Sequence, residues 1–142
     1  LSYDPAWWDE VFHTNVKGPF LVCQAVLPPM LERRQGSIIN VASRAAIWTT
    51  AGDVTYGPSK AALDRFTLNL AEAVRGRGVA VNGLGPGLIA SEMTRDAPRD
   101  RFGRTPEPPE VVVPAAVWLA QQTAATFTGR IVHRDEFGST WP

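Results

Sequence analysis

The sequence contains almost no cysteine, since Cys23 is the single one among 142 residues. One thiol cannot form an internal disulfide, and its position in an apolar run favours a buried, inert side chain over a nucleophile. Net charge is also absent, because 14 Lys and Arg balance 14 Asp and Glu. We therefore expect neither nucleic acid nor an anionic membrane as a partner, since both attract a basic surface.

Long hydrophobic runs are missing too. The longest apolar stretch, residues 20–31, is interrupted by one glutamine and two prolines and is too short to span a bilayer. No charged-then-apolar signal precedes it, so a cytoplasmic location is the default expectation. The two histidines, His13 and His133, lie far apart without a cysteine or acidic cluster at metal-ligand spacing, and we expect no metal site.

What the sequence does contain is a regular alternation of helical and strand patterns. With 44% hydrophobic and 20% charged residues, no repeat and no linker, it predicts one globular domain over residues 1–142. Helices are predicted from apolar periodicity and strands from short apolar runs. The predicted helices cover about residues 5–32, 56–75 and 109–122, and the predicted strands cover residues 36–43, 79–84 and 129–133.

The order of these elements indicates an α/β fold with a parallel sheet, in which the first strand would be an exposed edge. Asp4 and Pro5 would cap and start the first helix. The double proline at its far end should bend or break it near Leu27. From Val22 onward this helix is apolar nearly all round, and such a helix is usually covered by its own sheet and by a second subunit.

Tyr56 and Lys60 form the most informative pair, because residues four apart share a helix face. A phenol is protonated at neutral pH, and a neighbouring ammonium favours the ionised form that acid-base chemistry needs. Ser43 stands upstream at the carboxyl end of a predicted strand, where open α/β sheets place their ligands. Chance alone would place a lysine four residues after a tyrosine in about 3% of chains of this composition, so the pair needs support from its surroundings.

Two further elements stand in order around this pair. Asn15 lies in the first predicted helix, and Pro86 with Gly87 follows the second predicted strand. In this order the sequence resembles the short-chain dehydrogenase/reductase family, over nearly the whole chain. The resemblance implies a Rossmann-like, doubly wound parallel sheet. It also implies an oxidoreductase that transfers hydride between a nicotinamide cofactor, NAD or NADP, and a small carbonyl or alcohol substrate.

The same resemblance implies a role for each matching residue. Tyr56 would be the general acid or base, and Ser43 would hydrogen-bond the substrate oxygen. Lys60 would favour the phenolate and hold the nicotinamide ribose, while Asn15 would support a water for proton supply. The implied cofactor-binding residues are Tyr56, Lys60, Pro86, Gly87, Ile89 and Ser91, of which Ile89 and Ser91 lie in the segment that contacts the nicotinamide carboxamide.

Without the family resemblance, some of these residues have a simpler, structural interpretation. Asn15 alone would cap or bridge backbone, and the glycines at 83, 85 and 87 would mark a strand-to-loop turn rather than a phosphate loop. Most of the tryptophans would fill the core. Trp48 is the exception, because its loop lies between Ser43 and Tyr56 and would touch substrate. The excursion at residues 91–109, mobile from residue 97, would shape the substrate pocket.

The sequence departs from the family pattern at both ends. The strand and glycine-rich turn that seat the cofactor pyrophosphate are absent, so the N-terminal half of the Rossmann-like fold would be missing. At the other end, residues 135–138 replace the usual Gly-Gly. We therefore expect a C-terminal fragment that binds NAD(H) or NADP(H) poorly and turns over slowly or not at all. A micromolar dissociation constant in isothermal titration would contradict this.

Two other interpretations stay open. A truncated, non-catalytic paralogue would act by pairing with a full-length relative through the helices at 5–32 and 56–75. The other open interpretation is an unrelated α/β module.

The catalytic interpretation, like the paralogue, predicts pairing through these two helices, in its case as a homo-oligomer.

Overall fold

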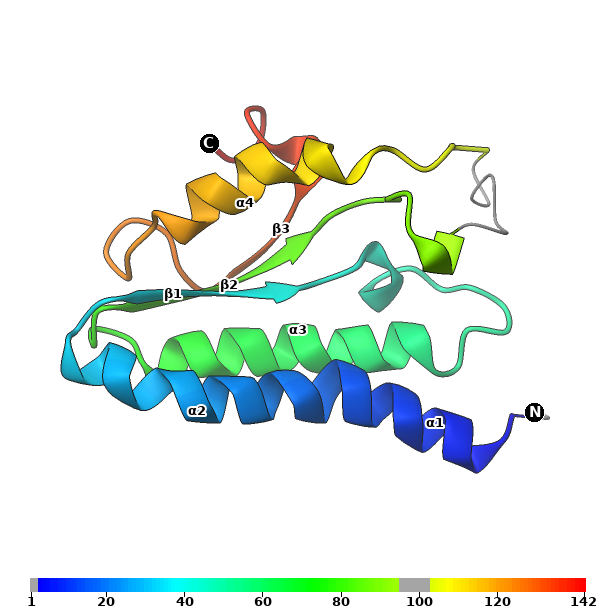
Figure 1. Ribbon diagram of the computed structural model, residues 1–142, viewed down its shortest axis with the longest axis horizontal. Helices are drawn as coiled ribbons and strands as arrows, with labels where there is room; N and C mark the ends of the chain where they lie inside the picture. The colour runs from blue at the N-terminus through cyan, green and yellow to red at the C-terminus, as the bar shows by residue number, and fades with distance from the viewer. Residues whose placement is uncertain (1–2, 95–102) are drawn as a thin grey trace.

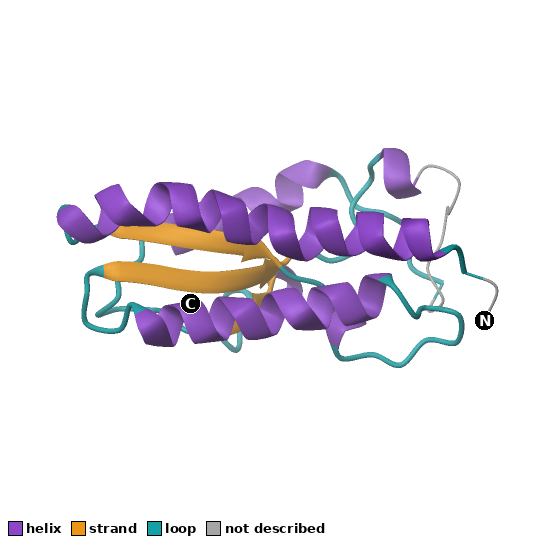
Figure 2. Cartoon of the chain, turned by 90° about the horizontal axis from the view of Figure 1, so that it is seen from below, coloured by secondary structure: helices purple, strands orange, loops and turns teal. Residues whose placement is uncertain are grey.

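The computed structural model describes residues 3–94 and 103–142 as a three-stranded parallel sheet with helices on both faces. The strands, β1 (Gly36–Val41), β2 (Val79–Gly85) and β3 (Arg130–His133), lie in the order β1-β2-β3. The helices α2 (Gly18–Glu32) and α3 (Tyr56–Ala73) run along one face, and α4 (Val113–Ala120) covers the other (Figure 1). Seen from below, the strands are visible between α2 and α3 (Figure 2). The predicted α/β class with a parallel sheet is confirmed.

The first predicted helix is divided at a different place from the one expected. α1 (Pro5–Phe12) begins after Asp4, whose Oδ1 accepts a hydrogen bond at 2.9 Å from the N–H two residues later, as its N-cap pattern predicts. A π-helical segment, His13–Lys17, then joins α1 to α2. A break of the helix near Leu27 is wrong, because α2 continues through the double proline. The two prolines remove two backbone N–H donors, yet the helix keeps its geometry to Glu32.

The ends of the other elements shift by a few residues. β1 ends at Val41, two residues before Ser43, where the chain turns into a short 3-10 segment. α4 begins four residues later than predicted, because the 3-10 turn Pro109–Val112 precedes it. Of the predicted excursion, residues 95–102 lie outside the described residues.

The core consists of two apolar clusters, one on each face of the sheet. Cys23 is buried in the cluster under α2 and α3, and burial raises the pKa of its thiol, as suits an inert side chain. The C-terminal tail closes the other cluster with Trp141, whose indole N–H donates to the carbonyl oxygen of His133 at 2.9 Å. The first cluster is Cys23, Ile38, Ala71, Val74, Val79 and Val81, and the second is Leu84, Ala115, Leu119, Phe127, Val132 and Trp141.

Two edges of the sheet are open within the described residues. β1 pairs only with β2, as predicted for the first strand, and β3 also pairs only with β2. α2 has exposed apolar side chains at Phe20, Leu21 and Val22, and Val22, which is 62% exposed, lines a groove beside β1. Over residues 3–94 and 103–142, each helix is too short or too polar to cross a membrane. The same residues bring no three His, Cys, Asp or Glu side chains together as a metal site would.

Candidate functional site

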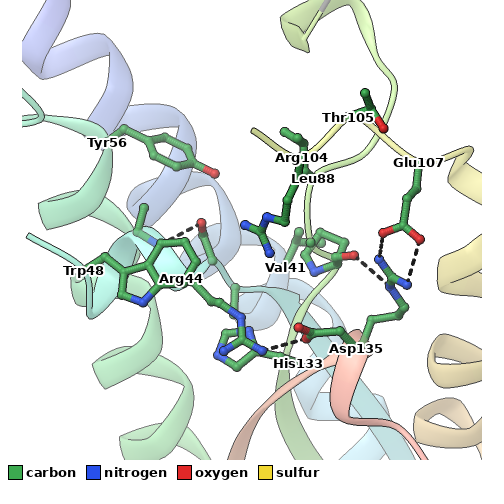
Figure 3. A pocket seen from close by; sticks show the side chains of 16 residues that line it. Val41, Arg44, Trp48, Tyr56, Leu88, Arg104, Thr105, Glu107, His133 and Asp135 are labelled. Carbon is green, nitrogen blue, oxygen red and sulfur yellow. Dashed lines mark hydrogen bonds and ion pairs between the residues drawn. The ribbon is translucent and has the colours of Figure 1, made fainter. Parts of the chain in front are cut away.

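The carboxyl ends of the three strands lie at one edge of the sheet, and the loops beyond them enclose a cavity of about 280 Å³ (Figure 3). Ser43 follows β1, Pro86 and Gly87 follow β2, and His133 ends β3. Tyr56 joins them from the first position of α3. Strands that run parallel all end at the same edge, which is why residues so distant in sequence meet here.

The position of Tyr56 depends on how α3 begins. The backbone N–H of Gly57 donates to both carboxylate oxygens of Asp53, at 2.9 and 3.1 Å. A Cβ on Gly57 would lie only 2.8 Å from the carbonyl oxygen of Ala45, so the start of α3 packs directly on the turn after β1. Tyr56 remains 37% exposed, and Figure 3 shows its ring beside the cavity. The turn that carries Ser43 and the helix that carries Tyr56 are therefore held together by backbone contact.

The hydroxyl of Ser43 also has a local partner. Its Oγ accepts a hydrogen bond from the N–H of Ala45 at 3.2 Å and so caps the 3-10 segment Arg44–Ala46. A hydroxyl that accepts in this way still has its own hydrogen to donate. Ser43 can therefore donate to an oxygen that enters the cavity.

Lys60 lies one turn after Tyr56 and is almost fully buried. Its Nζ donates to the carbonyl oxygen of Val41 at 3.0 Å and lies 5.7 Å from the centroid of the Tyr56 ring. Burial lowers the pKa of Lys60, and the nearby charge of Asp64 partly offsets that effect. The predicted sharing of one helix face is confirmed, and the buried cation is placed close to the phenol.

Asn15 contacts the start of α3 rather than Lys60 itself. It lies in the π-helical segment, and its Nδ2 donates to Ser59 Oγ at 3.0 Å. Ser59 Oγ in turn donates to the carbonyl oxygen of Tyr56 at 2.7 Å. Single π-helical turns inside α-helices are frequent at functional sites. Asn15 and Lys60 also line one groove along the open edge of β1.

Two predicted cofactor-binding residues, Ile89 and Ser91, are not among those that line the cavity. The hydroxyl of Thr94 holds their segment, because it donates to the carbonyl oxygen of Ile89 at 2.8 Å and accepts from the N–H of Ser91 at 2.9 Å. The backbone of Glu107 pairs with Leu88 and Ala90 on either side of Ile89. This pairing fixes the root of the excursion beside Pro86 and Gly87.

Arg44, which follows Ser43 directly, ties the first strand end to the last. Its guanidinium pairs with Asp135 at 2.6 Å and with Glu136 at 2.9 Å. Burial alone would raise the pKa of Asp135, but the hydrogen bond and charge of Arg44 outweigh it and lower that pKa. The residues that replace the family's usual ending therefore hold the turn beside Ser43.

Arg134 makes a second tie across the cavity. It forms an ion pair with Glu107, and its Nε donates to the carbonyl oxygen of Pro86 at 3.2 Å. Its neighbour His133 packs where Gly85 has no side chain, since a Cβ there would lie 2.2 Å from the His133 ring. Burial and then the charge of Arg44 lower the pKa of His133, which favours a neutral imidazole at neutral pH.

Sequence reasoning missed this charged ring around the cavity. In the sequence, the acidic pair at residues 135–136 stands out only as a departure from the family pattern. A usable signal was present, however, because Arg44 and this pair both follow strands that end at the same edge of the sheet. Trp48, whose loop between Ser43 and Tyr56 predicts contact with substrate, lines the cavity.

Comparison with protein families places these motifs in context. The family model for short chain dehydrogenases matches residues 1–101. The chain is 34% identical over 140 residues to the 3-oxoacyl-[acyl-carrier-protein] reductase FabG of Thermotoga maritima, covering 90% of this chain and 55% of that protein. It is 34% identical over 149 residues to the NADP-dependent 3-hydroxy acid dehydrogenase YdfG of Salmonella typhi, covering 89% of this chain and 60% of that protein.

Solved structures agree with this likeness. A gluconate 5-dehydrogenase from Burkholderia cenocepacia, in complex with NADP and tartrate, matches with a TM-score of 0.83 at 26% identity, over 93% of this chain and 56% of that one. A 3-oxoacyl-[acyl-carrier protein] reductase with bound NAD from Brucella melitensis matches with a TM-score of 0.79 at 29% identity, over 93% and 52%. The predicted Rossmann-like fold is confirmed, and the chain spans about half the length of the relatives it matches.

Proposed function

Because the chain belongs to the short-chain dehydrogenase family, we propose that it carries the proton-transfer centre of an NAD(P)-dependent oxidoreductase that interconverts a carbonyl and an alcohol. One observation carries the proposal. Tyr56 and Ser43 line one cavity, with the buried ammonium of Lys60 5.7 Å from the Tyr56 ring. An acid-base hydroxyl, a second donor and a cation are the groups that this chemistry needs.

Each side chain has one task in the proposed reaction. Nicotinamide, when bound, supplies or accepts the hydride. Tyr56 donates its proton to the carbonyl oxygen during reduction and takes it back during oxidation. Ser43, whose Oγ already accepts from Ala45, donates its own hydrogen to the same substrate oxygen. Lys60 stabilises the phenolate that remains when Tyr56 has given up its proton.

Asn15 would act through the first turn of α3. Its bond to Ser59, and the bond of Ser59 to the Tyr56 carbonyl oxygen, hold the backbone that carries the phenol. The implied role of Asn15 in supporting a water for proton supply is compatible with its position beside Lys60 in the same groove. Preorganisation of this kind lowers the cost of bringing the groups together during reaction.

The cofactor would be NAD or NADP, with its nicotinamide end held here. The donors fit a ribose diol, since Lys60 offers an ammonium and Tyr56 a hydroxyl on one helix face. Gly87, at φ 87°, gives the turn after Pro86 a shape that other residues rarely adopt, and this turn borders the cavity. Ile89 and Ser91 would offer backbone and hydroxyl groups to the carboxamide.

An alternative function is favoured by one observation, the exposed apolar surface of α2. A non-catalytic paralogue that pairs with a full-length relative would need such a surface, and Phe20 is 44% exposed there. The two functions are not exclusive, because pairing through α2 and α3 would also suit a homo-oligomeric enzyme.

The catalytic proposal is tested by adding the part of a relative that this chain does not match. The chain would be coexpressed with the part of the Thermotoga maritima FabG that its alignment does not cover. The absorbance of NADPH and NADH would then be followed with a 3-oxoacyl thioester. We expect turnover that falls by about a hundredfold or more in Tyr56→Phe, the loss typical of a missing general acid.

The matched control for this test is Tyr3→Phe, because Tyr3 is the one other tyrosine and contacts Gly52 outside the cavity. Tyr3→Phe should retain turnover. Activity that survives Tyr56→Phe would contradict the proposal, as would the absence of turnover with both nucleotides. Effector activity on a full-length relative without turnover would favour the non-catalytic alternative.

A further inference from the structure

The chain that leaves β2 is joined to a segment that comes back to the cavity about 20 residues later. The N–H of Glu107 donates to the carbonyl oxygen of Leu88 at 2.9 Å, and the N–H of Ala90 donates to the carbonyl oxygen of Glu107 at 2.8 Å. The two segments thus form one surface, the β2 wall, made of residues 86–90 and Glu107. Residues 86–88 and Glu107 line the cavity directly.

These backbone bonds alone hold the β2 wall weakly. Ala90 and Glu107 are both exposed, and a short two-stranded pairing with little buried apolar surface opens at a low cost in free energy. A side chain from a third element adds to the hold. Arg134, which directly follows β3, reaches the β2 wall with only 16% of its side chain exposed.

Arg134 contacts both segments of the β2 wall. Its Nη1 donates to Oε1 of Glu107 at 3.2 Å, and its Nη2 pairs with Oε2 of the same carboxylate. Its Nε donates to the carbonyl oxygen of Pro86 at 3.2 Å. One planar guanidinium therefore joins the turn after β2 to the returning segment. The fixed fork of arginine makes this possible, whereas a lysine ammonium is a single point charge.

The turn after β2 leaves room for this contact. Gly87 has a φ of 87°, which other residues rarely adopt, and a Cβ there would lie 3.0 Å from Nη2 of Arg134. That is closer than most Cβ atoms come to a neighbour. A side chain at this position would therefore push the guanidinium away from the carboxylate of Glu107.

Two sides of the cavity are tied to the same element, the 3-10 turn Arg134–Glu136 that follows β3. Arg44, the residue after Ser43, pairs with both carboxylates of this turn. Arg134, in the same turn, holds the β2 wall. The place of the β2 wall relative to Ser43 therefore depends on how firmly Arg134 keeps its contacts.

We propose, resting on the function proposed above, that Arg134 is a positioning residue for the reaction. It acts through Pro86 and Glu107 and keeps the β2 wall at a fixed place across the cavity from the reacting hydroxyls. Figure 3 shows Tyr56 and Glu107 on opposite sides of the cavity. A fixed wall keeps what lies between it and the hydroxyls of Tyr56 and Ser43 in one orientation, which is how positioning accelerates a reaction. Without Arg134 the wall takes other positions, and bound molecules react more slowly.

The first test measures exchange of backbone N–H groups with water by NMR in the full chain. Arg134→Met removes the donors and keeps an unbranched apolar stem. We expect the N–H groups of Ala90 and Glu107 to exchange about tenfold faster or more, because charge-assisted hydrogen bonds no longer hold the β2 wall. Glu107→Gln should have a similar effect. The N–H of Ala42, which donates to the carbonyl oxygen of Leu84 at 2.9 Å, reports the sheet and should be unchanged.

The second test separates positioning from charge. Arg134→Lys keeps a cation beside Glu107 but lacks the fork that reaches Pro86 at the same time. In the coexpressed enzyme described above, we expect kcat to fall about tenfold or more in Arg134→Met and to be only partly restored in Arg134→Lys. KM for the nucleotide should stay within about twofold. A merely structural role would lower the amount of folded protein and leave kcat per folded molecule unchanged.

The matched control is Glu72→Gln. It removes another ion pair, that of Glu72 with Arg75 at 2.5 Å, from the end of α3, far from the cavity. Both exchange rates and kcat should stay at the wild-type level in this variant. If Arg134→Met does not fold, Arg134→Lys and Glu107→Gln provide the same comparison, because each keeps a polar side chain in place.

Wild-type exchange at Ala90 and Glu107 in the Arg134 variants would overturn the proposal, and so would wild-type kcat per folded molecule. Neither result touches the proton-transfer proposal, which depends on the turnover of Tyr56→Phe. If the coexpressed enzyme shows no turnover, the proton-transfer proposal fails, and the exchange rates alone then decide whether Arg134 fixes the β2 wall.

Discussion

The position of Tyr56 depends on the absence of a side chain at the next residue, Gly57. A Cβ on Gly57 would lie 2.8 Å from the Ala45 carbonyl oxygen and 2.9 Å from Oδ2 of Asp53. Real Cβ contacts essentially never fall below 3.0 Å, so something must shift if one is added. The first of these partners is backbone beside Ser43 and cannot move alone. A single absent methyl group thus allows the turn after β1 and the start of α3 to meet.

We therefore expect Gly57→Ala to separate Tyr56 from Ser43. It should lower the free energy of unfolding by about 1–3 kcal/mol, as overpacking does, and reduce turnover in the coexpressed enzyme by more than that loss of stability explains. Urea unfolding and steady-state kinetics measure the two effects. Gly18→Ala is the control, because its Cβ would meet only an ordinary 3.6 Å contact in helix α2. Wild-type turnover in Gly57→Ala would contradict the argument.

Among the elements, α3 carries three functional groups on one face at four-residue steps, Tyr56, Lys60 and Asp64. Burial raises the pKa of Asp64 to about 6, and the charge of Lys60 opposes that rise. Its buried Oδ1 has no hydrogen-bond partner among the residues that the structure describes. Asp64 thus helps to keep Lys60 charged, and its own burial reduces the stability of the fold at neutral pH.

The sign of this cost follows from the two states of Asp64. The folded protein binds the proton more tightly than the unfolded chain, since its pKa is about 6 against 3.8. The fold is therefore more stable when Asp64 is protonated, below about pH 4, and this contribution to the free energy of unfolding is lost as the pH rises to about 6. Asp64→Asn should therefore gain about 1 kcal/mol above pH 6, a figure reduced because the group is half exposed, and should match wild type at pH 4.

Urea unfolding of Asp64→Asn and wild type across this pH range measures the difference. Asp9→Asn, an exposed position on α1, is the matched control and should run parallel to wild type. A difference between Asp64→Asn and wild type that does not change with pH would show that the carboxylate is not the cause.

At the scale of the whole molecule, the two sides of the sheet are covered unequally. On the α2 and α3 side, Phe20 stays 44% exposed although its ring meets that of Phe66 edge-on at 6.1 Å. This aromatic pair borders a shallow pocket between the two helices, lined also by Phe12 and Val16. Apolar surface of this kind, on adjacent helices, suits a second copy of the chain.

We expect the purified chain to form a dimer that Phe20→Asp converts to a monomer. Light scattering coupled to size-exclusion chromatography measures the mass, and circular dichroism confirms the fold. Val113→Asp is the control, because Val113 is 53% exposed on α4, on the opposite side of the sheet. A wild-type chain that is monomeric at micromolar concentrations would rule out this contact, and dimerisation that survives Phe20→Asp would place it elsewhere.

Much of the fold was readable because its signals are local. The N-cap at Asp4, the apolar strands and the four-residue spacing of Tyr56 and Lys60 each depend on a few neighbouring residues. The division of the first helix was misjudged because the double proline is a strong local signal. The π-helical segment, which instead interrupts it, brings Asn15 to Ser59, a contact with a helix 44 residues away.

By itself the sequence determined the order of elements, the identity of the four motif residues and the surface that α2 leaves apolar, since periodicity and spacing follow from backbone geometry. Only the tertiary structure decided how Arg44 meets Asp135 and Glu136, and that the guanidinium of Arg104 lies close to the Trp48 ring. These contacts join segments about 90 and 55 residues apart, and their partners are chosen by how parallel strands bring their ends together rather than by any local pattern.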